Sequence, residues 1–328
     1  LGESRYAGPQ VRLPITQAYM TAGTDSGHQN QPGAEPQAFA LNEEALHNFA
    51  YAAYKKTHDV AVHIGRLYYG ESPRHSYYMG GSEGGREAMT MAQRYPADFD
   101  GIISLDPVMN FSGLQTFGNN VGGILQSAPG GWLNGKTQLV HDTVLAACDA
   151  LDGITDSVVS HYLGCKVPAD AALAAKRCAS GTDEGPACLS DAQLATIAAA
   201  HTGYSFNFPL ANGMTAYAPF GYGGEGLPGN WERWMVGTVP PSFTAAPNVS
   251  GMNNLFTFGN GYVRYFIAQD PNFNPLGYDP DNFQARVQAV SDIMDATNPD
   301  LTAFFNRGGK LIVKEDMADT AQSPFTAL

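Results

Sequence analysis

A serine flanked by small residues is the strongest chemical feature of the sequence. Ser82 stands at the centre of residues 80–84, Gly-Gly-Ser-Glu-Gly, which fit the pattern Gly-x-Ser-x-Gly. In this pattern the serine lies on a sharp turn between a strand and a helix, and small residues let the two approach closely. We expect Ser82 to be the nucleophile of an acyl transfer and the backbone N–H of Glu83 to stabilise the oxyanion. A glycine-rich structural turn is the alternative.

A nucleophilic serine of this kind works with a carboxylate and a histidine, in the chain order serine, acid, histidine. Asp319 lies in the loop after the last predicted strand, where the acid is expected. Its neighbours Glu315 and Asp316 are the competing candidates.

The position of the histidine is the difficulty. All eight histidines precede Asp319 in the chain. Three explanations are open: the histidine lies beyond Leu328, His28 takes its place from a loop at the sheet edge, or the protein is inactive. We favour the first and expect His28 to stabilise its loop.

Strands and helices alternate where these residues lie, which is typical of a mostly parallel sheet with helices on both faces. Asn42 suits the N-cap of a long helix whose apolar face carries Leu46, Phe49, Ala50 and Ala53. The predicted strands are 17–24, 75–79, 99–105 and 308–314, and further helices are predicted through 60–67 and over 86–94.

Between residues 109 and 285 this alternation fades, and glycines, prolines and aromatic residues dominate. We interpret 109–285 as a lid domain inserted into an α/β-hydrolase core formed by 1–108 and 286–328, which we expect to be incomplete at both ends. Arg233 and Arg264 lie in this segment and could pair with a substrate carboxylate or face solvent. Aromatic pockets suit flat aromatic substrates, although most of these side chains should form the lid's own core. They are Tyr204, Phe206, Phe208, Tyr217, Phe220, Tyr222, Trp231, Trp234, Phe243, Phe256, Phe258, Tyr262, Tyr265 and Phe266.

All four cysteines lie between residues 148 and 188. An even, local cluster predicts two disulfides and an oxidising compartment, with Cys148–Cys165 and Cys178–Cys188 as the nearest-neighbour pairing. A zinc site is the weaker alternative, because no pair has the Cys-x2-Cys spacing.

The loop after the first cysteine carries three aspartates, Asp149, Asp152 and Asp156, around a glycine. Calcium takes six to eight oxygen ligands from carboxylates and backbone carbonyls on a sharply turning loop. The carbonyls of Ile154 and Val158 could complete the set. We expect a structural Ca²⁺ here, and an acidic turn pinned by a disulfide is the alternative.

The overall charge and hydropathy exclude two classes of partner. The formal net charge is −13, and no basic run is present. Nucleic acid is therefore not expected as a partner, because binding phosphates needs clustered Lys and Arg. No apolar stretch of about 18 residues is present, so we expect no membrane span.

Several motifs in the same order resemble the tannase and feruloyl esterase family: residues 26–29, 80–86, 93–102, 148–153 and 318–324. The resemblance implies a secreted serine esterase with a calcium-bearing lid that cleaves aromatic esters. The family's serine matches Ser82 and its acid matches Asp319. Its calcium ligands match Asp149, Asp152, Ile154, Asp156 and Val158.

Two departures from the family pattern stand out. Gly81 occupies the position where the family commonly has a cysteine that is bridged to one beside the catalytic histidine. The histidine segment and an N-terminal segment that supplies a second oxyanion donor are not found in these 328 residues. The residues around Ser82 are most similar to the branch that cleaves terephthalate monoesters.

The expected function is hydrolysis of an aromatic ester through an acyl-enzyme. The acyl group is expected to be a hydroxycinnamate, a gallate or a terephthalate monoester. A non-catalytic ligand-binding protein of the same fold and a transacylase remain the alternatives.

Overall fold

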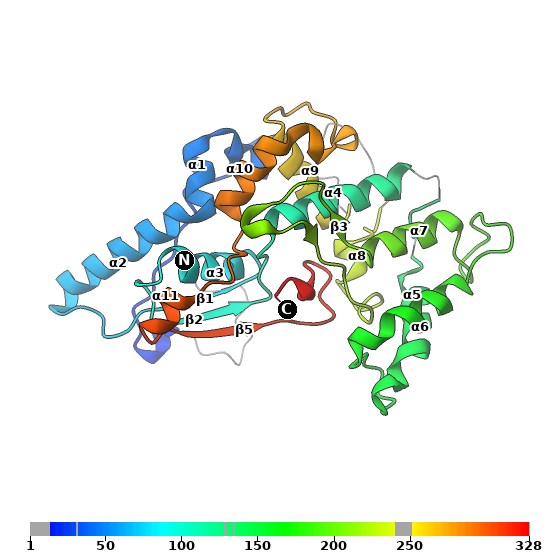
Figure 1. Cartoon of the computed structure of the whole chain (residues 1–328), viewed down its shortest axis with the longest axis horizontal. Helices are drawn as coiled ribbons and strands as arrows, with labels where there is room; N and C mark the ends of the chain where they lie inside the picture. Colours follow the sequence, from blue (N-terminus) through cyan, green and yellow to red (C-terminus); the bar gives the residue numbers. More distant parts are fainter. Residues whose placement is uncertain (1–13, 31, 128–129, 134, 240–250, 328) are drawn as a thin grey trace.

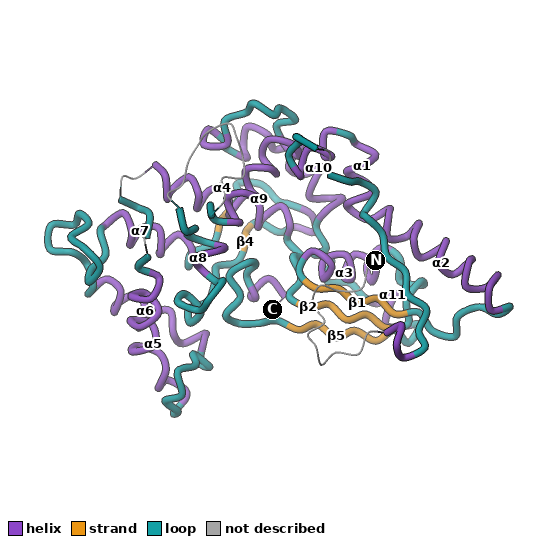
Figure 2. Tube along the Cα trace, turned by 180° about the vertical axis from the view of Figure 1, so that it is seen from behind, coloured by secondary structure: helices purple, strands orange, loops and turns teal. Residues whose placement is uncertain are grey.

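The structure is a computed structural model that describes residues 14–30, 32–127, 130–133, 135–239 and 251–327. Phe243 lies outside the described residues. A small parallel sheet, a two-stranded antiparallel sheet of β3 (Tyr204–Ser205) and β4 (Ala216–Tyr217), and many helices make up the described part of the chain (Figures 1 and 2).

The central sheet has three parallel strands in the order β1-β2-β5. These are β1 (Tyr77–Gly81), β2 (Gly101–Leu105) and β5 (Lys310–Lys314). Gly81 pairs with Leu105, which in turn pairs with Lys314, so the three strands end at the same level. The strands predicted at 75–79, 99–105 and 308–314 are thus confirmed, with their ends displaced by about two residues.

One face of this sheet is covered by α3 (Glu83–Arg94), as Figure 1 shows. Ala88 and Met91 of α3 pack in one cluster with Ile102 of β2. The opposite face carries Tyr77, Met79 and Ile312, which are 58%, 53% and 59% exposed. Within the described ranges, helices therefore cover one face of the sheet, whereas the sequence predicted helices on both.

The strand predicted at 17–24 is wrong. Pro14–Gln17 is a 3-10 turn (η1), and the residues that follow have no regular structure. Ala18 has a φ of 65°, which breaks an extended conformation. The apolar residues that suggested a strand make side-chain contacts instead: the ring centroid of Tyr19 lies 6.4 Å from that of Tyr77.

The helix predicted after Asn42 is confirmed. The side chain of Asn42 accepts a hydrogen bond of 3.0 Å from the N–H of Ala45, as an N-cap does. The helix runs as α1 (Glu43–His47), one π-helical turn η3 (Asn48–Ala52) and α2 (Ala53–Tyr69), so the helix predicted through 60–67 is also confirmed. Its predicted apolar face is buried at Leu46, Ala50 and Ala53 and partly buried at Phe49.

The described part of segment 109–285 is largely helical, and α5 (Thr137–Cys148), α6 (Tyr162–Ala174) and α7 (Asp191–Ala200) lie together away from the sheet (Figure 1). Many of its aromatic residues are buried in one core, among them Tyr217, Phe220, Trp231 and Tyr262 of the predicted set. This core also includes Leu46 and Ala50 from the start of the chain. The division into a core and a lid domain stays a prediction.

The remaining elements complete the description. They are η2 (Pro36–Leu41), α4 (Phe111–Ser127), α5 (Thr137–Cys148), η4 (Asp149–Asp152), α6 (Tyr162–Ala174), α7 (Asp191–Ala200), β3 (Tyr204–Ser205), η5 (Ala211–Gly213), β4 (Ala216–Tyr217), α8 (Trp231–Trp234), α9 (Asn254–Gly261), η6 (Tyr262–Ile267), η7 (Pro275–Gly277), η8 (Pro280–Phe283), α10 (Gln284–Met294), α11 (Thr302–Asn306) and η9 (Pro324–Ala327).

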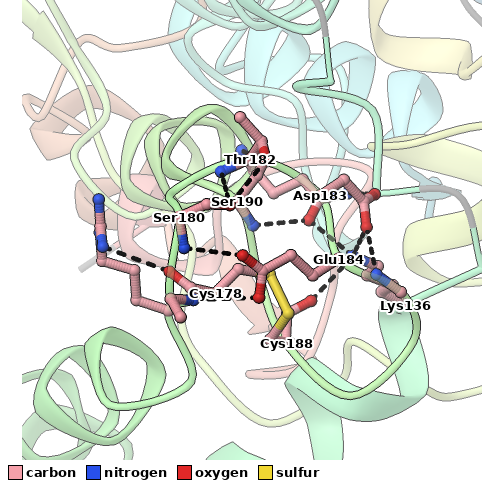
Figure 3. Close-up of a disulfide and its surroundings, with 12 residues drawn as sticks. Lys136, Cys178, Ser180, Thr182, Asp183, Glu184, Cys188 and Ser190 are labelled. Atoms are coloured by element: carbon pink, nitrogen blue, oxygen red, sulfur yellow. Dashed lines mark hydrogen bonds and ion pairs between the residues drawn. A yellow bond between two sulfur atoms is a disulfide. The ribbon is translucent and has the colours of Figure 1, made fainter.

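Both predicted disulfides are confirmed. Cys148 is bonded to Cys165 and Cys178 to Cys188. The four sulfur atoms are therefore not available as zinc ligands. Figure 3 shows the second bridge, where the nearly buried Lys136 donates a hydrogen bond of 2.8 Å to the carbonyl of Cys188. This contact ties the disulfide loop to α5.

Candidate active site

The turn at Ser82 joins the end of β1 directly to the start of α3. Ser82 has φ 59° and ψ −119°, a conformation that non-glycine residues rarely adopt. Its N–H donates to the carbonyl of Leu105 at 2.8 Å, and its carbonyl accepts the N–H of Gly85 at 2.9 Å. Strained backbone of this kind, held by hydrogen bonds on both sides, is what exposes a nucleophilic hydroxyl on a strand-to-helix turn.

Two glycines make this turn possible. A Cβ at Gly80 would overlap the carbonyl of Gly84, and a Cβ at Gly85 would lie 2.8 Å from the carbonyl oxygen of Leu105. The sequence pattern predicted close approach at residues 80 and 84. The structure shows that the helix side of the contact needs glycine at 85, because a Cβ at Gly84 meets nothing within 4 Å.

Glu83 is the first residue of α3, where a backbone N–H has no acceptor within the helix. Its N–H is thus available next to Ser82. Its side chain is held elsewhere, because Glu83 Oε1 lies 2.6 Å from the guanidinium of Arg86. Burial raises the pKa of Glu83 to about 7, and the charge of Arg86 opposes that rise.

Arg86 anchors the helix that follows the serine, a role that the sequence analysis missed. Its side chain is fully buried and donates to the carbonyls of Ala50 (2.9 Å), Met294 (3.0 Å) and Phe49 (3.1 Å), in addition to the Glu83 carboxylate. It therefore fixes α3 to the first helix and to the end of α10. An acid three residues before an arginine in the first turn of the helix was the available signal.

Replacing Arg86 with methionine is expected to lower the free energy of unfolding by about 3–5 kcal/mol, because the buried carbonyls of Ala50 and Met294 lose this donor and the partly exposed Glu83 carboxylate loses its ion pair. Urea unfolding measures this change. Arg66→Met on α2 is the matched control, since Arg66 is exposed, and should change the free energy by less than about 0.5 kcal/mol. Equal effects of the two substitutions would contradict the role given to Arg86.

The predicted acid lies in the loop after β5, at the same sheet edge as Ser82. Asp319 is partly buried, and its Oδ1 accepts the N–H of Ala321 at 2.7 Å. Burial raises the pKa of its carboxyl, whereas that hydrogen bond lowers it. The loop places a fixed carboxylate beyond the carboxyl end of the strand, as the sequence predicted.

The two competing acids have different surroundings. Burial raises the pKa of Glu315 to about 8, although Gln322 donates a hydrogen bond to its carboxylate. Glu315 is therefore largely protonated at neutral pH. Asp316 is exposed and pairs with Lys314. Of the three, Asp319 best combines partial burial with a hydrogen bond to its charged form.

The histidines do not complete this arrangement. In the part of the chain that the structure describes, no histidine is hydrogen-bonded to Ser82 or Asp319. His28 stacks on Phe39 with 3.7 Å between ring centroids and lines a cavity of about 610 Å³ formed by segment 27–48. Neither Ser82 nor Asp319 lines that cavity. The stacking agrees with the expectation that His28 stabilises its loop.

The loop predicted to bind calcium is exposed and follows α5. Asp149 Oδ1 accepts the N–H groups of Asp156 (3.1 Å) and Ser157 (3.0 Å), and Asp152 Oδ1 accepts that of Ile154 (2.9 Å). These hydrogen bonds use one carboxylate oxygen of Asp149 and one of Asp152. The loop turns sharply at Gly153, whose φ is 93°. The donor types and the turn suit Ca²⁺, but the three carboxylates of this described loop are not gathered within 4.8 Å of one another.

Of the three arginines of segment 109–285, the two that could pair with a substrate carboxylate, Arg233 and Arg264, have different surroundings. Arg264 is nearly buried, and its Nε donates to the carbonyl of Pro271 at 2.7 Å. Arg233 is exposed and lies over the ring of Trp234. Arg264 thus serves the local fold, and Arg233 is the guanidinium that remains accessible.

A parallel sheet with a serine on a positive-φ turn between strand and helix is typical of α/β-hydrolases. The model of the family described as tannase and feruloyl esterase matches residues 2–328 of this chain. The chain therefore belongs to the tannase and feruloyl esterase family.

Individual relatives agree with this assignment. An uncharacterized esterase of Agrobacterium fabrum is 34% identical over 325 residues, covering 96% of this chain and 57% of the relative. The mono(2-hydroxyethyl) terephthalate hydrolase of Piscinibacter sakaiensis is 29% identical over 96% of this chain and 58% of its own length. The chain thus spans rather more than half the length of these relatives.

The fold is shared with solved structures. An esterase from Aspergillus oryzae superposes with a TM-score of 0.74 at 22% identity, over 92% of this chain and 54% of that structure. Feruloyl esterase B from Aspergillus oryzae gives a TM-score of 0.71 at 23% identity, over 88% and 53%.

Proposed function

We propose that the protein is a serine carboxylic ester hydrolase that works through an acyl-enzyme. The turn at Ser82 carries this proposal, because its positive φ, its hydrogen bonds on both sides and its glycine contacts serve to expose one hydroxyl at the carboxyl edge of a parallel sheet. Membership of a family of esterases supports it independently.

The mechanism has two acyl-transfer steps. Ser82 Oγ attacks the ester carbonyl, a histidine base takes the hydroxyl proton, and the N–H of Glu83 stabilises the oxyanion. The same histidine then gives its proton to the departing alcohol. Water next attacks the acyl-enzyme by the same route, which releases the acid and restores Ser82. Asp319 orients the histidine and stabilises its charged form.

The base is proposed to be a histidine from the part of the relatives' length that this chain does not span. The support is that no described histidine is hydrogen-bonded to Ser82 or Asp319, while the chain covers 57% of the length of one relative. Assays of the proposed activity therefore use the full-length protein.

The acid part of the substrate is proposed to be aromatic: a hydroxycinnamate, a gallate or a terephthalate monoester. Relatives named feruloyl esterase and mono(2-hydroxyethyl) terephthalate hydrolase support this class. Hydrolysis of methyl ferulate, methyl gallate and mono(2-hydroxyethyl) terephthalate, each compared with Ser82→Ala as a blank, tests it. Faster hydrolysis of an aliphatic ester than of all three would contradict the aromatic class, and transfer to added alcohol in preference to water would identify a transacylase.

A structural Ca²⁺ is proposed for the loop of η4, held by the carboxylates of Asp149, Asp152 and Asp156 and the carbonyls of Ile154 and Val158. Family resemblance and the donor types support the site. The ion would fix this loop and is given no step in catalysis.

Calcium is expected to raise the thermal midpoint of the protein and EDTA to lower it. At a free concentration 100 times the dissociation constant, binding adds about 2.7 kcal/mol to the free energy of unfolding. Calorimetry with and without Ca²⁺ measures the change, and Asp152→Asn should remove most of it. Asp142→Asn, on the exposed side of α5, is the control that keeps the response. A midpoint indifferent to Ca²⁺ would contradict the site.

A secreted or periplasmic location is proposed. The two disulfides support it, because such bonds persist in oxidising compartments. None of the described helices is long and apolar enough to cross a membrane.

A further inference from the structure

Asp106 stands between the two halves of the proposed catalytic site. It directly follows β2, the middle strand, just as Ser82 follows β1 and Glu315 follows β5. Neighbouring strands of a sheet lie about 4.8 Å apart, so Asp106 starts one strand away from each. Its φ of 44° turns the chain sharply out of the strand. Neither the sequence motifs nor the family resemblance singled out this residue.

On one side, the segment around Asp106 is bonded to the nucleophile. The N–H of Ser82 donates to the carbonyl of Leu105 at 2.8 Å, and the N–H of Val108 donates to the carbonyl of Ser82 at 3.3 Å. The backbone of Ser82 is therefore held by the residue just before Asp106 and by the second residue after it.

On the other side, Asp106 is bonded to the loop that carries the acid. Its N–H donates to the carbonyl of Lys314 at 2.7 Å, and its Oδ1 accepts the N–H of Asp316 at 2.7 Å. Its Oδ2 lies 3.1 Å from the Lys314 ammonium. Asp316 is in turn bonded to the proposed acid, because its carbonyl accepts the N–H of Asp319 at 2.8 Å.

We propose that Asp106 is a positioning residue that joins the Ser82 turn to the acid loop and sets where Asp319 stands relative to Ser82. The inference rests on the proposed function. Asp316 and Lys314 engage both of its carboxylate oxygens, so the Asp106 side chain is held toward the acid loop.

The charge of Asp106 also acts on the loop. The charged and titratable groups that face it are Lys314, Glu315, Asp316 and Asp319. Burial is the main cause of the raised pKa of Glu315 and of Asp319, and the negative charge of Asp106 raises both further. Removing that charge must therefore lower the pKa of these carboxyls.

The test compares Asp106→Ala and Asp106→Asn in the full-length protein. Alanine removes the anchor of the loop, and we expect kcat for an aryl ester to fall about 100-fold with KM little changed, as for a small displacement of catalytic groups. Asparagine keeps an oxygen that accepts the N–H of Asp316, so most of kcat should return. Because asparagine lacks the charge, the acid limb of its pH–rate profile should move to lower pH, since loss of a nearby negative charge disfavours the protonated form of the histidine base.

Asp100→Ala is the matched control. Asp100 precedes β2 at its other end and makes the same kinds of contact: it accepts the N–H of Ser76 at 2.9 Å and pairs with Arg307 at 3.0 Å. The substitution Asp100→Ala should leave kcat close to that of the wild type. Equal kcat for Asp106→Ala and Asp100→Ala would overturn the inference. An unshifted pH–rate profile for Asp106→Asn would also overturn it. If Asp106→Ala fails to fold, the profile of Asp106→Asn alone decides between the two results. If Ser82→Ala keeps the wild-type rate, the proposed function fails instead.

Discussion

Ser82→Ala is expected to lower kcat for ester hydrolysis by about four to six orders of magnitude, because the mutant lacks the oxygen that forms the acyl-enzyme. Substrate binding should survive, because the hydroxyl contributes little to the ground-state complex. Steady-state hydrolysis of a p-nitrophenyl ester by the full-length protein measures the loss, and equilibrium dialysis with a non-hydrolysed amide analogue measures binding.

Ser157→Ala is the control for this substitution. Ser157 also has a positive φ, of 65°, and is exposed, so alanine there replaces a serine at another positive-φ position away from Ser82. Its activity should equal that of the wild type. If Ser82→Ala hydrolyses the ester as fast as Ser157→Ala does, Ser82 is not the nucleophile.

Asp319→Asn is expected to lower kcat by about 10⁴-fold while the protein stays folded. The amide is nearly the same size as the carboxylate, but it carries no charge to stabilise the imidazolium that forms when the base takes the proton. The loss should be measured at several pH values, with circular dichroism to confirm the fold.

The neighbouring acids supply the controls for Asp319. Asp316→Asn should change kcat little, because Asp316 is exposed. Glu315→Gln should also change it little at neutral pH, since the raised pKa of Glu315, about 8, leaves the wild-type group largely protonated there. A larger loss in either variant than in Asp319→Asn would assign the acid to that residue instead.

Much of the sheet and the strand-to-helix turn at Ser82 could be predicted from local sequence. Strands at 75–79, 99–105 and 308–314 are marked by β-branched and aromatic runs, and Asn42 marks its helix because an N-cap needs only its own side chain and the next turn. The disulfide pairing followed from spacing alone, since both bridges close short loops.

The features that the sequence analysis missed or predicted wrongly depend mainly on tertiary contacts. Contacts between distant parts of the chain leave no pattern in the local sequence. Residues 17–24 have a strand-like composition, yet Tyr19 contacts Tyr77 through its ring and not through a backbone ladder. Arg86 and Asp106 are ordinary charged residues in sequence. Glu83 lies three residues before Arg86, but the partners Met294 of Arg86 and Asp316 of Asp106 lie about two hundred residues away along the chain, so no window of sequence contains those contacts.

Labelling by a fluorophosphonate tests the central claim most directly, because this reagent reacts with an activated serine by the chemistry proposed for the substrate. The full-length protein should take up one phosphonyl group, and tandem mass spectrometry of the digest should locate it on Ser82. Excess aryl ester should slow the labelling of the wild type. Without added ester, Asp319→Asn should be labelled more slowly than the wild type. Uptake on another serine with Ser82 unmodified, or no uptake by a protein that hydrolyses the ester, would contradict the account.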